Sequence, residues 1–186
     1  MLTRVGKEIQ KFLMVNQSGI PGVSLSASST TPALIAAKTT SNETLYIPPM
    51  ANSNSASIMT DYNNSSYGIA VGSSDTAATE DDYILGNLIT TLKQSAVPQV
   101  SLVYDAENTK LIARIDLPLV NDTAEDIIVR EIGRFASYYT TATKGAMPSN
   151  SASTKRCVLV ERTVLETPVT VPANGTATIR YDFIYG

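Results

Sequence analysis

The chain has 186 residues, of which 43% are hydrophobic and only 17% are charged, and its net charge is −3. A pI near 4.9 and the lack of a basic cluster argue against nucleic acid as a main partner, because phosphate binding needs concentrated Lys and Arg. No stretch approaches the roughly 20 apolar residues that a membrane helix requires. The size suits one domain, and so lightly charged a surface is poorly protected against association. We therefore expect a chain that works assembled, as a homo-oligomer.

Residues 1–15 form the best helix candidate, because apolar residues recur from Leu2 at helical spacing while charged residues fall between them. Thr3 could cap the start of this helix. We expect it either to lie across an opening of the main domain or to dock as an arm onto a neighbouring subunit. The segment lacks the apolar core and cleavage site of a secretory signal, which predicts folding in a cytoplasm.

Residues 16–66 read as a polar, loop-rich insert with short strands at 34–37, 44–47 and 56–60. Scattered apolar and tyrosine residues favour ordered loops that pack against a partner or the main domain. Together with the predicted helix, they supply the candidate assembly interface: Leu2, Val5, Ile9, Phe12, Tyr46 and Tyr62.

Residues 67–186 are predicted to form the core. A strand at 67–72 precedes an acidic stretch, in which Thr79 could cap one turn of helix through residues 80–82. The three acids of that turn could instead hold a cation, but the alternating ligands and central glycine of a calcium loop are missing.

Further strands are predicted at 100–105, 111–119, 126–132 and 135–141, with Gly133 breaking the last two apart. An apolar run over 156–172 leads to a turn at Asn174, and a final strand covers 176–185. In that strand one face is apolar and the other polar, and the apolar face carries Ala177, Ile179, Tyr181, Phe183 and Tyr185.

Strands that recur about every ten residues are typical of a sandwich. The predicted fold is therefore mainly β, an antiparallel β-sandwich of jelly-roll or Ig-like type with a short N-terminal α-helix, one domain overall. The C-terminal strand is expected at the centre of a sheet or along a seam.

Catalysis has little support. There is no histidine, which removes the usual general base. With one cysteine and no histidine, a zinc site would need carboxylates alone, which is not the usual ligand set. Asp122, Glu125 and Asp126 could hydrolyse a glycoside as paired carboxylates, but they sit in a polar turn and read as solvated. We predict no catalytic, cofactor-binding or metal-binding residues.

Two further predictions concern single side chains within the strands. Glu131 and Arg130 are expected to pair with Arg162 or Glu161 across a sheet. Cys157, inside a strand, reads as a small buried hydrophobe, with a reactive or intersubunit thiol as the alternative.

Three blocks of the chain resemble a family of tailed-bacteriophage virion proteins. They lie within 69–85, 127–135 and 162–176, and their matching residues are Val71-Gly72 with Thr76-Ala77, Thr79, Asp82 and Leu85, then Ile128-Val129-Arg130-Glu131-Ile132-Gly133, then Arg162-Thr163-Val164-Leu165 with Pro168-Val169-Thr170-Val171-Pro172 and Gly175-Thr176. Ala78 stands where the family usually has proline, and Arg134 where an apolar residue is usual.

The resemblance implies a β-sandwich component of the particle, on the head surface, as a capsid decoration, or at the neck or tail. Its partners would be copies of itself and other virion subunits, and it would be made in the host bacterial cytoplasm. A receptor- or glycan-binding module of a tail fibre is the alternative, which nine tyrosines without a tryptophan make weaker. A tail-associated hydrolase is a third, remote reading.

Overall fold

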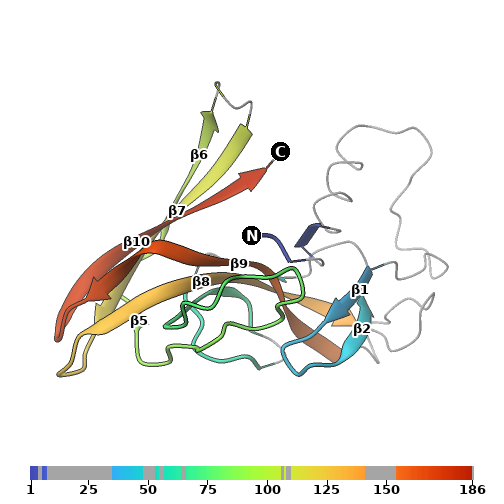
Figure 1. Cartoon of the computed structure of the whole chain (residues 1–186), viewed down its shortest axis with the longest axis horizontal. Helices are drawn as coiled ribbons and strands as arrows, with labels where there is room; N and C mark the ends of the chain where they lie inside the picture. Colours follow the sequence, from blue (N-terminus) through green and yellow to red (C-terminus); the bar gives the residue numbers. More distant parts are fainter. Residues whose placement is uncertain are drawn as a thin grey trace.

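The computed structural model describes residues 1–3, 6–7, 35–47, 53–54, 57–63, 66–105, 107, 110–140 and 154–185. This part of the chain is mainly β, its named strands all pair antiparallel, and it contains no helix element (Figure 1). Among the described residues there is accordingly no helix long and apolar enough to cross a membrane.

The first sheet is built around β8 (Ile127–Thr140), which pairs along its length with β9 (Thr154–Val171). Two short strands, β3 (Ser53–Asn54) and β4 (Gly68–Gly72), pair with β8 as well. A separate hairpin is formed by β1 (Ile35–Lys38) and β2 (Thr44–Ile47). The short strands predicted at 34–37 and 44–47 are therefore confirmed within one residue.

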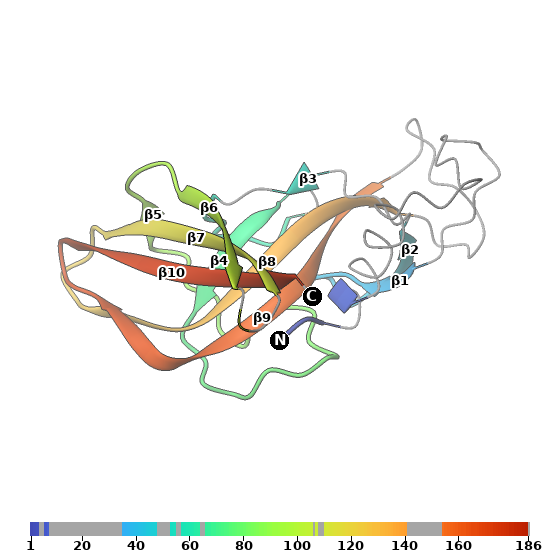
Figure 2. The same ribbon diagram turned by 90° about the horizontal axis from the view of Figure 1, so that it is seen from above.

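The second sheet repeats this plan around β7 (Lys110–Asn121), which pairs along its length with β10 (Gly175–Tyr185). Two shorter strands, β5 (Lys93–Gln94) and β6 (Gln99–Asp105), also pair with β7. Seen from above, β7 and β10 lie over β8 and β9 (Figure 2).

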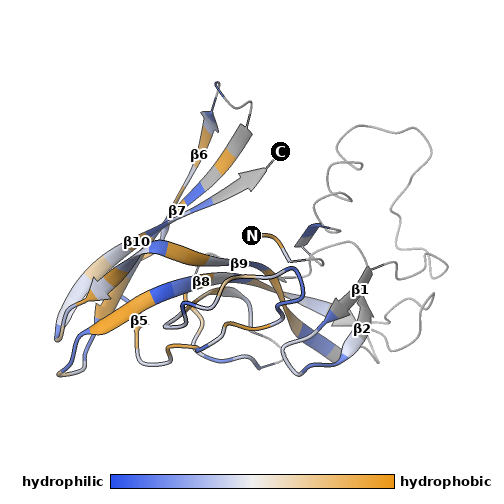
Figure 3. Ribbon diagram, in the orientation of Figure 1, coloured by the Kyte–Doolittle hydropathy of each residue, from blue (hydrophilic) through white to orange (hydrophobic). Residues whose placement is uncertain are grey.

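Both sheets contribute to one apolar core. The alternation predicted for the last strand is confirmed where side chains are described, because Ile179 and Tyr181 are buried while Thr178 and Arg180 are exposed. Figure 3 shows apolar positions recurring along β8 and β10. The buried members of the core are Ile69, Val71, Ile89, Leu92, Ile115, Leu117, Leu119, Val129, Ile132, Val171, Ile179 and Tyr181. Burial of each large apolar side chain is worth roughly 1.5–3 kcal/mol, so these contacts hold the two sheets together.

The predicted turn at Asn174 is a corner between the two sheets, since β9 belongs to the first and β10 to the second. Asn174 has φ 50°, the left-handed conformation that asparagine tolerates better than most residues. Among the described strands β10 lies at the edge of its sheet, with β7 as its neighbour. Of the two positions expected for it, the centre of a sheet is therefore wrong, and a seam stays a prediction.

The predicted break at Gly133 is also wrong, because β8 runs through it without interruption. The glycine instead makes room for packing. A Cβ atom there would lie 2.8 Å from Cδ2 of Leu85 and 3.1 Å from Cδ1 of Leu159, two buried members of a second, smaller apolar cluster. A register shift in the pairing with β9 follows between Arg134 and Phe135.

The N-terminus is attached to β9. Leu2 bridges to Glu161, the amide of Thr3 donates to the carbonyl of Val160 (3.1 Å), and the amide of Arg162 donates to the carbonyl of Met1 (3.0 Å). Leu2 is therefore extended and not helical.

The hydroxyl of Thr3 accepts a hydrogen bond from the Gly6 amide (3.1 Å), and the Thr3 carbonyl accepts one from Lys7 (2.9 Å). This arrangement is that of a helix N-cap. The other residues of the helix predicted for 1–15 lie outside the described residues, so that helix stays a prediction.

Candidate functional site

The residues predicted to form an assembly interface divide into three groups. Val5, Ile9 and Phe12 lie outside the described residues. Tyr46 belongs to β2, where it pairs with Ala36, and its side chain is not described. The remaining two, Leu2 and Tyr62, make contacts within their own chain.

Tyr62 packs its ring against Phe135, with the ring centroids 5.2 Å apart, and its hydroxyl accepts a hydrogen bond from the Leu85 amide (3.1 Å). Burial raises the pKa of Tyr62 to about 12. Leu2 is partly buried beside β9. Their role in assembly stays a prediction.

A different surface stands out on β6. Its three alternate residues Val100, Leu102 and Tyr104 are exposed by 59%, 70% and 64%, and Val97 just before the strand is exposed by 77%. Alternate residues of a strand share a face, so Val100, Leu102 and Tyr104 form one apolar surface, which we name the β6 face. Single exposed apolar residues are ordinary, but a contiguous set points to a contact.

The β6 face continues the core-facing side of the second sheet. Val100 pairs with Ile115, and Ile115 pairs with Tyr181. Directly paired residues point to the same side of a sheet, and both Ile115 and Tyr181 are buried. In Figure 1 the end of the sheet that carries β6 stands away from β8 and β9. The core side of the sheet therefore runs past the part that the first sheet covers.

The opposite side of the same sheet carries two ion pairs between β7 and β10, and next to them the partly buried apolar pair Val103 and Ile112. Arg114 binds Asp182 through two hydrogen bonds of 2.8 and 2.7 Å, and Arg180 binds Asp116 in the same way at 2.7 and 3.0 Å. These hydrogen bonds lower the pKa of Asp116 and of Asp182. The charges alternate in sign between β7 and β10, which suits a surface in water. The large, strongly exposed apolar side chains of β6 are therefore those of the β6 face.

Sequence reasoning missed the β6 face, although it predicted the strand at 100–105. The signal was present, because Val100, Leu102 and Tyr104 recur with a period of two. A period of two indicates that one side of the strand is apolar. The pattern is the same whether that side is buried in the core or exposed to solvent.

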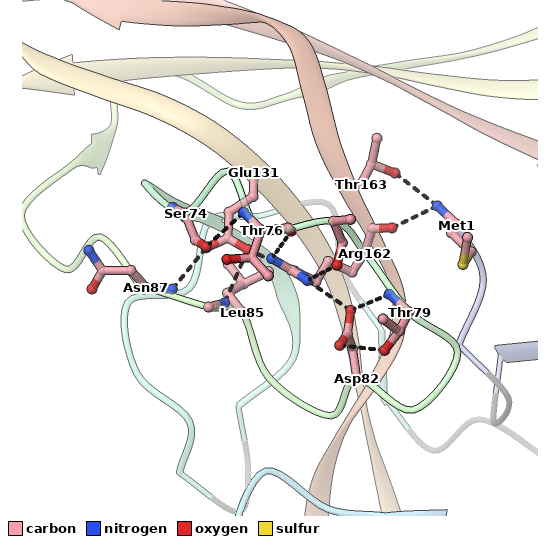
Figure 4. Close-up of polar contacts among 12 residues, drawn as sticks. Met1, Ser74, Thr76, Thr79, Asp82, Leu85, Asn87, Glu131, Arg162 and Thr163 are labelled. Atoms are coloured by element: carbon pink, nitrogen blue, oxygen red, sulfur yellow. Dashed lines mark hydrogen bonds and ion pairs between the residues drawn. The ribbon is translucent and has the colours of Figure 1, made fainter.

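The second notable group is a buried ion cluster, which we name the Arg162 cluster: Asp82, Glu131 and Arg162 (Figure 4). Arg162 is 3% exposed and Glu131 is fully buried, and Nε of Arg162 lies 2.8 Å from Oε2 of Glu131. Nη1 of Arg162 lies 2.8 Å from Oδ2 of Asp82. The predicted pairing of Glu131 with Arg162 is confirmed.

The Glu131 carboxylate accepts three further hydrogen bonds from main-chain amides, those of Ser74 (3.3 Å), Gly86 (3.1 Å) and Asn87 (2.9 Å). Arg162 also donates to the carbonyl of Thr76 (2.9 Å). A buried charge without partners costs several kcal/mol, so movement of the loop of residues 73–87 away from Glu131 and Arg162 would be unfavourable. These hydrogen bonds therefore hold the loop against β8 and β9.

The predicted turn of helix after Thr79 is a hydrogen-bonded turn. Oδ2 of Asp82 accepts from the Thr79 amide and Oδ1 from the Thr79 hydroxyl, both at 2.8 Å. Partial burial raises the pKa of Asp82, but the hydrogen bonds from Thr79 and Arg162 outweigh it and leave the pKa lowered. Two of the three acids are used in ion pairs, since Asp82 binds Arg162 and Glu80 binds Lys7.

The carboxylates considered for catalysis support the β7–β8 turn and the β9–β10 corner. Asp122 pairs with Lys93 at 2.8 Å, and Oδ1 of Asp126 accepts a hydrogen bond from the Ala173 amide, also at 2.8 Å. Within the described residues no three His, Cys, Asp or Glu side chains are grouped to hold a metal ion. Cys157 is fully buried, as predicted, and burial raises its pKa to about 12.

The described residues thus present one surface suited to binding another protein, the β6 face, and one buried ion cluster that fixes a loop. No protein-family model, curated protein or solved structure matches this chain.

Proposed function

We propose that the chain is a structural component of a tailed-phage virion that acts by protein–protein assembly, on the head surface or at the neck or tail. The observation that carries the proposal is the β6 face, where Leu102 is 70% exposed between two further exposed apolar residues. A water-facing apolar side of this kind is expected at an interface.

The resemblance supports the choice of a virion. Its three blocks are far apart in the sequence, yet each supplies one member of the Arg162 cluster: Asp82, Glu131 and Arg162. If the three blocks share these residues with the family for a structural reason, the residues are expected to contact one another, and they do. We also infer that the two antiparallel sheets are the layers of a β-sandwich, since one core joins them. The jelly-roll or Ig-like type and the N-terminal helix stay predictions.

The partners would be copies of the chain and other virion subunits, and assembly would follow synthesis in the host bacterial cytoplasm. An antiserum against the purified chain, applied to intact particles of the phage that encodes it, tests the proposal. Labelling at a fixed position on the particle is the expected result. A chain that is abundant in infected cells but missing from purified particles would overturn the proposal.

A matched pair of variants connects this test to the β6 face. The first variant carries Val100→Thr, Leu102→Thr and Tyr104→Thr, which keep the strand preference of β6 but remove its apolar surface. The control carries Thr176→Ser and Thr178→Ser on the exposed, polar side of β10. We expect the first variant to fold and to be lost from particles, and the control to be incorporated normally.

A further inference from the structure

The free edge of β6 is unprotected. Among the described strands β7 alone pairs with β6, so one row of its main-chain amides and carbonyls has no strand beside it. Natural proteins blunt such edges with lysine, proline or a bulge. Residues 99–105 contain no lysine or proline, and their pairing with β7 shows no register shift. An edge of this kind is a template for one more strand.

The sequence of β6 is complementary to itself in the antiparallel direction. A two-fold axis at Leu102 would place Leu102 opposite the same residue of a second copy. Val100 would then lie opposite Tyr104, and Gln99 opposite Asp105. Both apolar pairings fall on the β6 face, so that the two apolar surfaces would become one.

Charge favours this direction over the parallel one. Asp105 is the sole charged residue of β6. In the antiparallel register it faces the neutral amide of Gln99, which can donate a hydrogen bond. In an in-register parallel pair it would face Asp105 of the other copy, and like charges directly opposite are destabilising.

We propose that two copies of the chain pair through β6, antiparallel and centred on Leu102, to form one continuous sheet from the two β7–β10 sheets. The proposal rests on the proposed function in assembly and names the contact between copies. A C2 contact is isologous, so the same strand must serve on both sides, and the sequence of β6 meets that condition.

The register predicts which engineered cysteines can form a disulfide. Opposite residues of an antiparallel pair have Cα atoms about 4.5–5.5 Å apart, within disulfide range. The two Val100 residues of the pair would be offset by four positions along the strands, which is about 14 Å and too far for a disulfide. The same holds for the two Tyr104 residues. Packing of the two faces against each other would instead place the strands about 10 Å apart, beyond disulfide range.

The test uses the full-length chain with Leu102→Cys, Val100→Cys or Tyr104→Cys, oxidised and analysed on a non-reducing gel. Wild type is the control, since its own Cys157 is buried. We expect the Leu102→Cys variant to form a covalent dimer, and the other two to do so only when mixed with each other. Because these side chains are exposed, the substitutions leave the core intact.

A second measurement follows association without cross-linking. Leu102→Lys would bring two ammonium groups together on the axis, so we expect the dimer dissociation constant from light scattering to rise at least tenfold. Val97→Lys, equally exposed but before the strand, should change it much less.

Three outcomes would overturn the pairing: a wild type that stays monomeric at high concentration, a Leu102→Cys variant that does not cross-link, or a Val100→Cys variant that cross-links alone. The failures are distinguishable. If the chain is present in particles but cross-links fail, the pairing is wrong and the function in assembly stands. If it is missing from particles, the proposed function itself fails.

Discussion

Nε of Arg162 lies 2.8 Å from Oε2 of Glu131, although the two residues are not partners in the β8–β9 register. Glu131 is opposite Val164, and Arg162 is opposite Gly133. The ion pair is therefore diagonal across the two strands. The Glu131 carboxylate of this pair also accepts hydrogen bonds from three main-chain amides of the loop at 73–87. The Arg162 guanidinium also binds Asp82 in the same loop.

Arg162→Met should destabilise the fold strongly. The substitution keeps an extended side chain but leaves Glu131 buried without its cation, and removal of one partner of a buried pair costs about 3–5 kcal/mol. Urea unfolding, followed by far-UV circular dichroism, measures the change. The matched control is Arg180→Met, which removes an ion pair on the exposed side of β10 and should have a far smaller effect. Equal losses in the two variants would contradict the importance of the buried cluster.

Gly72→Ala should destabilise the same region by another route. A Cβ atom at this position would lie 2.6 Å from the Asn87 carbonyl oxygen and 2.7 Å from Cγ of Glu131, and would also clash with Oε1 of Glu131. Overpacking of this kind costs typically about 1–3 kcal/mol. The unfolding midpoint in urea should fall at an unchanged slope. Ser73→Ala, beside it on the half-buried rim of the loop, serves as the control, and a tolerated Gly72→Ala would show that the loop can move away.

Glu161→Gln should alter the pH dependence of stability. Burial raises the pKa of Glu161 above 4.5, an effect that the positive N-terminus and Arg134 only partly offset. Well below the ordinary glutamate pKa of about 4.3 the side chain is neutral in both states. As the pH rises, the unfolded chain loses this proton first, so the free energy of unfolding falls until the pH passes the folded pKa.

The variant with glutamine is neutral throughout and does not lose this stability. We therefore expect its free energy of unfolding, relative to wild type, to increase as the pH rises above the unfolded pKa and to level off once the pH has passed the folded pKa of Glu161. Glu166→Gln, an exposed position on the same strand, should show no such increase. A constant difference between the Glu161 variant and wild type would refute the assigned shift.

Thr3→Val should weaken the attachment of the N-terminus. The Thr3 hydroxyl lies 2.8 Å from the carbonyl of Leu159 and 2.9 Å from that of Val160, and it accepts the Gly6 amide, while the residue is only 1% exposed. Loss of a buried hydrogen-bonded hydroxyl and of a cap costs about 1–2 kcal/mol. Amide exchange of Thr3 and Arg162 should accelerate, whereas Thr178→Val on the exposed side of β10 should leave it unchanged.

Several features of the fold could be predicted because they are local. The period of two in residues 176–182 predicted which side of β10 is buried, and the backbone preference of Asn174 predicted the turn. The pairing of Glu131 with Arg162 was accessible as well, since charges inside strands need partners. The errors at Gly133 and in the position of β10 have one origin: the space around a residue and the neighbour of a strand are set by contacts distant in sequence.

Consecutive residues were enough to predict strands with one apolar and one polar side, because alternation along a strand is a local pattern. Which of these apolar sides are covered follows only from the folded chain. Ile115 and Val100 are paired in one sheet and are similar in character, yet one is 8% exposed and the other 59%. The difference arises from where the first sheet lies over the second, which depends on packing between segments that are far apart along the chain.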